Sequence, residues 1–272
     1  MVYKCIEIPW GNQCYFKLGC PHNIFDLIKT LFPQTLITDN KNYDAILLHK
    51  SGYWQIDGND EEGLIYFSQK FDEEYLSYKI AISIEEMIEM KINSLVLHGG
   101  AVSKNNKAII FCQQRRAGKT VLLTDLLSEE GVEYLSDDII FVNNDDVSGI
   151  GMPLRLRENS IKGIRMSGTI VGIAADPDGG KRFFYVPSCP YYKGNAKLRA
   201  IILPNYGKEN KNLFVEISGK DKFSNLIVNV RKPNNMEYLY KTLVKLCNKV
   251  PIYKLDYNDI TFAWIVVNMI WN

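Results

Sequence analysis

Short runs in which apolar and polar residues alternate make up the first part of the chain, and this pattern indicates half-buried β-strands. Turn-forming sequences such as Gly11-Asn12 and Ser51-Gly52 separate the runs. We expect strands at 3–8, 13–18, 45–49, 53–56 and 64–68, and a short helix at 22–31. Residues 1–92 are therefore predicted to form a small β-rich N-terminal subdomain that ends in a connecting helix.

That connecting helix is predicted over 71–91, where apolar residues recur at helical spacing and acids surround them. Such a helix turns its apolar stripe toward a core. The predicted stripe consists of Tyr75, Tyr78, Ile82, Met87 and Met90.

From residue 94 the pattern becomes strand, turn, strand, loop and helix. Apolar strands are expected at 95–97 and 108–111, and a helix over 121–128 that Gly131 ends. Further strands are expected at 134–135, 139–142, 154–156, 182–186, 200–203, 214–217 and 252–255, and helices at 221–229, 236–248 and 258–270. The fold class is therefore α/β, with a second domain over 93–272.

The loop between the strand at 108–111 and the following helix reads Gln-Gln-Arg-Arg-Ala-Gly-Lys-Thr over 113–120. A phosphate-binding loop has the pattern G-x-x-x-x-G-K-[ST], in which backbone N–H groups surround the anion, the Lys reaches the outer phosphates and the hydroxyl binds Mg²⁺. Gln113 occupies the first glycine position, so the match is imperfect. Arg115 and Arg116 add positive charge beside the expected phosphates. The alternative is an ordinary helix N-terminus with a solvated Lys119.

Two adjacent acids, Asp137 and Asp138, follow the strand expected at 134–135. A carboxylate at a strand end beside a nucleotide can hold Mg²⁺, and a second one can accept a proton from an attacking hydroxyl. Adjacent residues of an extended chain point to opposite sides, so separate roles are expected. The alternative is a solvated turn.

Three more side chains are candidates for the same site. His98 ends the strand before the loop and can orient a phosphate or move a proton, although a turn histidine explains it equally well. Arg155 and Arg157 share one face of an extended segment, where two guanidinium groups suit phosphate or carboxylate binding. The alternative for the arginines is an exposed basic edge strand.

In this order, His98-Gly99, the apolar strand, the loop, the helix and Asp137-Asp138 resemble the catalytic domain of HPr kinase/phosphorylase. They resemble still more closely the HPr kinase-related proteins, including those encoded beside modified peptides such as lasso peptides. His98 lies 15 residues before Gln113, as the His-Gly motif of the family does. Pro153-Leu154-Arg155 is similar to its proline-arginine strand, and the resemblance spans roughly 94–256.

The resemblance implies a PEPCK-like P-loop fold of the HPr kinase C-terminal type. It also implies transfer of phosphate from ATP, with Mg²⁺, to a serine hydroxyl of a peptide or small protein. Lys119 would then bind the β- and γ-phosphates, His98 would lie near the γ-phosphate, and one of Asp137 and Asp138 would be the base while the other holds metal. We assign the metal to Thr120 and Asp138. The nucleotide contacts are assigned to Gln113, Arg115, Arg116, Ala117, Gly118, Lys119, Thr120, Arg155 and Arg157.

The loop also departs from the family, which keeps glycine at the position of Gln113 and usually a small residue at that of Arg116. Two alternatives therefore stay open. One is a catalytically degenerate nucleotide- or peptide-binding partner in a biosynthetic complex. The other is a related phosphotransferase that uses a different phosphorylated donor.

Composition narrows the choice of partners. The formal net charge is +1, so no global field predicts a nucleic-acid or anionic-membrane partner. The most apolar run, 260–271, is shorter than the roughly 20 residues that span a bilayer. The six cysteines lack zinc spacing and the N-terminus lacks an apolar signal, so a cytoplasmic setting is expected. Because 260–267 is apolar nearly all round, that helix is buried in the core or in a homo-oligomer interface.

Overall fold

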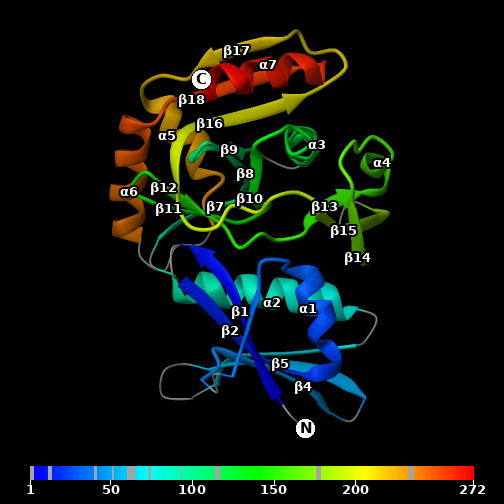
Figure 1. Ribbon diagram of the computed structural model, residues 1–272. Coiled ribbons are helices and arrows are strands. Elements are labelled where there is room, and N and C mark those ends of the chain that lie inside the picture. Colours follow the sequence, from blue (N-terminus) through cyan, green and yellow to red (C-terminus); the bar gives the residue numbers. More distant parts are fainter. Residues whose placement is uncertain are drawn as a thin grey trace.

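The computed structural model describes residues 3–11, 14–39, 42–50, 52–59, 65–72, 75–92, 94–113, 117–175, 179–231 and 236–272. These residues form a mixed α/β protein, as predicted. Figure 1 shows an N-terminal sheet at the bottom of the view, a helix layer above it and the C-terminal part at the top.

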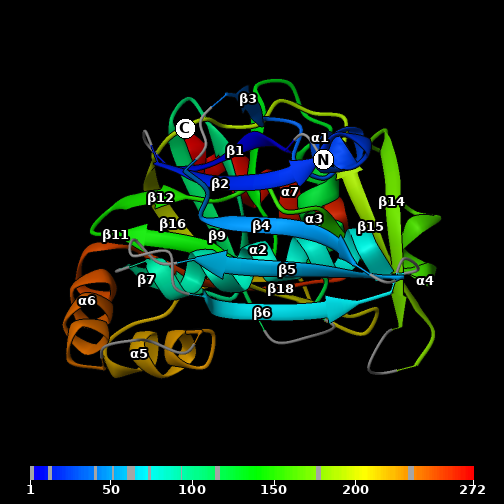
Figure 2. The same cartoon turned by 90° about the horizontal axis from the view of Figure 1, so that it is seen from below.

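The N-terminal sheet has the strand order β3-β1-β2-β4-β5-β6. Its pairs are antiparallel except for β2 with β4. Figure 2 views this sheet from below, with α2 (Leu76–Lys91) behind it. A short 3-10 turn, η1 (His22–Ile24), leads into α1 (Phe25–Leu31). The strands are β1 (Tyr3–Gly11), β2 (Cys14–Pro21), β3 (Leu36–Thr38), β4 (Ala45–Lys50), β5 (Tyr53–Asn59) and β6 (Ile65–Phe71).

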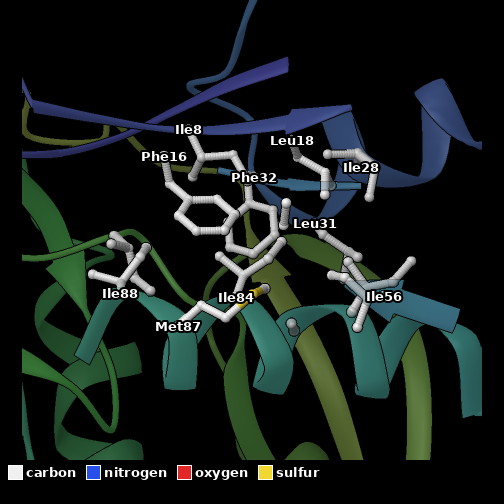
Figure 3. Close-up of a cluster of buried hydrophobic side chains, with 14 of the residues drawn as sticks. Ile8, Phe16, Leu18, Ile28, Leu31, Phe32, Ile56, Ile84, Met87 and Ile88 are labelled. Atoms are coloured by element: carbon white, nitrogen blue, oxygen red, sulfur yellow. The ribbon is translucent and has the colours of Figure 1, made fainter. Parts of the chain in front are cut away.

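Helix α2 is buried on two sides. Ile84, Met87 and Ile88 pack against the N-terminal sheet and α1 (Figure 3). Tyr78 meets Phe184 of the C-terminal part, with ring centroids 5.2 Å apart. The predicted stripe is confirmed at Met87 and at Tyr78, which packs against the same core, but it is wrong at Tyr75 and Met90, which are exposed. Ile84 and Ile88 are buried instead. Apolar residues on both sides of one helix blur the single stripe that the sequence analysis assumed.

The C-terminal sheet is organised around β16 (Ala196–Tyr206). On one side β16 pairs in parallel with β9 (Lys107–Cys112). On the other side the start of β16 pairs antiparallel with β12, and its later part pairs in parallel with β18 (Ile252–Tyr257). The remaining strands are β7 (Leu95–Leu97), β8 (Gly99–Lys104), β10 (Val132–Ser136), β11 (Ile140–Asn143), β12 (Asp146–Ser148) and β17 (Leu213–Glu216).

Helices cover both faces of this sheet. Because side chains alternate along a strand, Ile110 of β9 joins the core under α6 (Met236–Lys249), whereas Phe111 joins the core under α3 (Lys119–Leu126). Helix α5 (Lys220–Ile227) lies with α6. Helix α7 (Ile260–Trp271) lies with α3, and it buries one face while exposing Ile265 and Met269 on the other.

A small third sheet has the order β13-β15-β14. It consists of β13 (Leu154–Arg157), β14 (Gly168–Ala175) and β15 (Lys181–Pro187), and α4 (Glu158–Ile161) follows β13. The predicted division at 92/93 separates the two large sheets, but one hydrophobic core crosses it. Ile139, Phe141 and Phe184 belong to the same cluster as the residues of α2. The two-domain division therefore stays a prediction.

Candidate phosphate-binding site

The loop after β9 ends at Gly118, which adopts φ +83° directly before α3. A Cβ atom there would lie 2.7 Å from the Cβ of Tyr206 and 2.8 Å from Oη of Tyr257. The amide of Tyr206 also donates to the carbonyl of Ala117 at 3.0 Å. Glycine is therefore needed at 118 both for its backbone angle and for the close approach of the ends of β16 and β18.

Gln113 begins the loop at the position where the motif has its first glycine. It is half-buried and is not among the described residues with positive φ. The backbone angle at 113 therefore does not demand glycine. Arg115 and Arg116, predicted to add charge here, lie outside the described residues.

Lys119 and Thr120, the first residues of α3, both contact the paired acids. The buried Nζ of Lys119 lies 2.8 Å from Oδ1 of Asp137 and 3.3 Å from Oδ1 of Asp138. Oγ1 of Thr120 donates to Oδ2 of Asp137 at 3.2 Å. Burial alone would lower the pKa of Lys119, but the two carboxylates outweigh it and raise the pKa to about 12. Lys119 is therefore a buried, charged ammonium and not a solvated lysine.

Asp137 and Asp138 follow β10 and turn toward the same place. Asp138 has φ +68°, so the chain is not extended there, and both carboxylates reach Lys119. The expectation that they point to opposite sides is wrong for this reason. Burial works to raise the pKa of Asp138, but Arg155 and then Lys119 hold it well below its usual range.

Two glycines let these parts meet. A Cβ atom at Gly100 would lie 2.1 Å from Cδ1 of Leu123 in α3 and 3.0 Å from Oδ1 of Asp137. A Cβ atom at Gly149 would lie 2.5 Å from Cβ of Ser136, just before the acids. Close packing at these positions holds α3 and the acids together.

His98 lies between β7 and β8, with its Nδ1 3.9 Å from Oδ1 of Asp138. Its amide donates to the carbonyl of Asn229 at 2.7 Å, which fixes the backbone. Burial first, and then the charge of Lys119, lower the pKa of His98. The hairpin that brings His98 to the loop joins β8 to β9, whereas β7 pairs with β11. His98 itself lies at a bend, and Gly99 and Gly100 after it belong to strand β8.

Arg155 and Arg157 project from one face of β13, because Leu154 and Leu156 alternate with them and are buried. Nη1 of Arg155 lies 2.7 Å from Oδ2 of Asp138, and its Nη2 lies 2.5 Å from Oε2 of Glu85. Burial would lower the pKa of Arg155, but the carboxylates of Asp138 and Glu85 raise it. No sequence signal singles out Glu85, because the acids of α2 are expected around the apolar stripe and not at the site.

These residues surround one cleft of about 520 Å³ at the start of α3. Most of the predicted residues line this cleft, and so does Arg182. In the register of the third sheet, Arg182 of β15 lies opposite Arg157 of β13. Asp137 lies behind the cleft and is buried. The predicted residues that line the cleft are His98, Gln113, Ala117, Gly118, Lys119, Thr120, Asp138, Arg155 and Arg157.

The donor atoms here suit Mg²⁺, which prefers hard oxygen ligands and usually binds through one or two carboxylates plus phosphate and water. The hydroxyl of Thr120 and the carboxylate of Asp137 lie side by side and would supply such a set. Within the described ranges no group of three or more His, Cys, Asp or Glu side chains could hold a metal ion.

No protein-family model matches the sequence. No curated protein matches it either. Among the helices of the described segments, none is long and apolar enough to cross a bilayer. The interpretation of the site therefore depends on its own residues and their contacts.

Proposed function

We propose that the protein is an ATP-dependent, Mg²⁺-requiring kinase of the PEPCK-like P-loop type. The observation that carries the proposal is the convergence of Lys119, Thr120 and the two aspartates at the start of α3. A cation, a hydroxyl and two carboxylates around one cleft are what phosphoryl transfer needs, because its catalysis is mostly positioning and charge neutralisation. The resemblance to HPr kinase-related proteins supports a serine of a peptide or small protein as the acceptor.

The contacts support a division of roles between the two acids. Asp137 is buried and bonds to Thr120, which favours it over Asp138 as the metal partner of that hydroxyl. Asp138 lines the cleft beside His98 and is therefore better placed to accept the proton of an acceptor hydroxyl. Bound Mg²⁺ would neutralise charge on the phosphates. Lys119 would bind the outer phosphates once it leaves the aspartates.

This assignment gives Asp138 two states. With Arg155 and Lys119 in contact, its pKa is held well below the usual range, and the carboxylate is a weak base. A triphosphate competes for the same two cations. Its binding would withdraw Lys119 and Arg155 toward the phosphates and raise the basicity of Asp138 where the acceptor arrives.

The test is transfer of labelled phosphate from ATP to a panel of serine-containing peptides with Mg²⁺, together with ATP hydrolysis. Wild type should be active, and Lys119→Ala, Asp137→Asn and Asp138→Asn should each lose at least a hundredfold. Lys241→Ala is a matched control, because its ion pair with Glu237 lies on the exposed surface of α6.

The alternatives give different results in the same series. Saturable ATP binding without turnover would favour a non-catalytic binding partner, which the bulk of Gln113 motivates. Binding of another phosphorylated donor in place of ATP would favour a related phosphotransferase. Absence of binding by every common purine triphosphate with Mg²⁺ would refute the proposal.

A further inference from the structure

A buried carboxylate from the N-terminal part of the chain reaches the site. Glu85 lies on α2 and its side chain is only 1% exposed. It is 70 residues away in sequence from Arg155, which it contacts. A buried acid is costly unless it is paired, so its two oxygens must have partners. Oε2 forms an ion pair with Arg155, and Oε1 forms one with the guanidinium of Arg231.

The guanidinium of Arg155 in turn contacts two carboxylates. Nη2 faces Glu85 and Nη1 faces Asp138, so the planar fork bridges α2 and the acid that lines the cleft. A guanidinium held at two nitrogens has its orientation fixed, which a single ion pair does not achieve. Arg231 is itself anchored, because its amide donates to the carbonyl of Val96 and its Nε lies 2.7 Å from Glu89.

We propose that Glu85 is a positioning residue of the candidate site, which holds the guanidinium of Arg155 in the orientation that places Nη1 against Asp138. The proposal deepens the proposed function, because it gives α2 and the N-terminal sheet a role in the chemistry. Glu85 is not among the described residues that line the cleft, and it acts through Arg155. The N-terminal part is then a built-in component of the kinase site.

Removal of the charge from Glu85 should disturb the geometry of Arg155. In Glu85→Gln the guanidinium loses the ionic partner that fixes its orientation, so Nη1 is no longer held in one position against Asp138. We expect kcat for phosphate transfer or ATP hydrolysis to fall at least tenfold while KM for ATP does not rise. General damage to the site would instead raise KM and lower kcat together. Glu86→Gln is the matched control, because it makes the same change at the next residue of α2, and it should change neither constant more than twofold.

A double-variant cycle tests whether Arg155 carries the effect. In an Arg155→Met background, Glu85→Gln should change the residual kcat by less than twofold. A tenfold fall in that background, or wild-type kcat in Glu85→Gln itself, would overturn the proposal. If Glu85→Gln fails to fold, Glu85→Asp replaces it, since the shorter side chain keeps the buried charge but withdraws it from Arg155 and should give the same selective loss of kcat.

The same proteins separate this proposal from the proposed function. If wild type neither turns over nor binds ATP, the proposed function fails. The coupling between Glu85 and Arg155 is then measured from the urea unfolding midpoints of the same variants without nucleotide. Coupled residues give a double variant whose midpoint shift is smaller than the sum of the single shifts. Additive shifts would overturn the link.

Discussion

Replacement of Lys119 by methionine should destabilise the protein even in the absence of any ligand. A solvated loop lysine would contribute little, but Lys119 is buried between Asp137 and Asp138. Methionine keeps most of the apolar stem and removes only the charged end. Asp137 then keeps the hydrogen bond from Thr120, and Asp138 keeps the ion pair with Arg155.

The magnitude follows from the loss of one partner in a buried ion pair, which costs about 3–5 kcal/mol. Because Thr120 and Arg155 continue to compensate the acids, we expect the low end, about 3 kcal/mol. A loss of that size lowers the melting temperature of a domain of this size class by about 6–12 °C.

Urea unfolding followed by far-ultraviolet circular dichroism, without nucleotide or metal, measures the effect. Lys241→Met is the matched control and should leave the midpoint unchanged, because its ion pair with Glu237 is exposed. Millimolar Mg²⁺ should recover part of the stability of Lys119→Met, since a cation can occupy the oxygens beside Thr120. A variant as stable as wild type at pH 7.5 would refute the buried position of Lys119 and the argument built on it.

Three further changes test single contacts. Thr120→Val should weaken Mg·ATP binding at least tenfold in calorimetry and leave metal-free ATP unchanged, because only the hydroxyl beside Asp137 is lost. Gly118→Ala should lower the melting temperature more than Gly179→Ala, since both have positive φ but only position 118 has atoms within 4 Å of the new Cβ. Burial raises the pKa of Glu89 to about 7, although Arg231 acts in the opposite direction. An acid whose pKa is raised in the folded protein lowers stability at pH values above its pKa in the unfolded chain. The urea midpoint of wild type, relative to Glu89→Gln, should therefore rise as the pH falls from 7 to about 4.5; equal profiles would contradict the burial of that carboxyl.

The sequence predicted elements well where turn signals bound an apolar run. Strands β4 and β5, helix α6 and strand β18 lie where they were expected. Strand β8 is not predicted as a separate strand by the sequence pattern, because it opens with two glycines that look like a turn. The Asn105-Asn106 pair, both with positive φ, is the hairpin signal that could have revealed it. Strand β14 was missed because its small and exposed residues lack a clear alternation.

The same contrast holds within the site. The loop at 113–120 and the acids at 137–138 are local motifs, so their chemistry is visible in a short stretch of sequence. Glu85 has no such signal, since its role arises only when α2 packs against β13 and β15. The sequence likewise gives no sign that the two aspartates point to the same side, because this depends on the positive φ of Asp138.

The charges of the candidate site are already paired before any ligand binds. Lys119, Arg155 and Arg231 face Asp137, Asp138 and Glu85. A triphosphate that draws Lys119 and Arg155 away leaves the aspartates without their cations, and an uncompensated buried carboxylate is costly. Mg²⁺ bound together with the nucleotide would offset that cost, because it would bring positive charge to the oxygens that the cations leave. Nucleotide and metal should therefore bind together, and each should bind far more weakly alone.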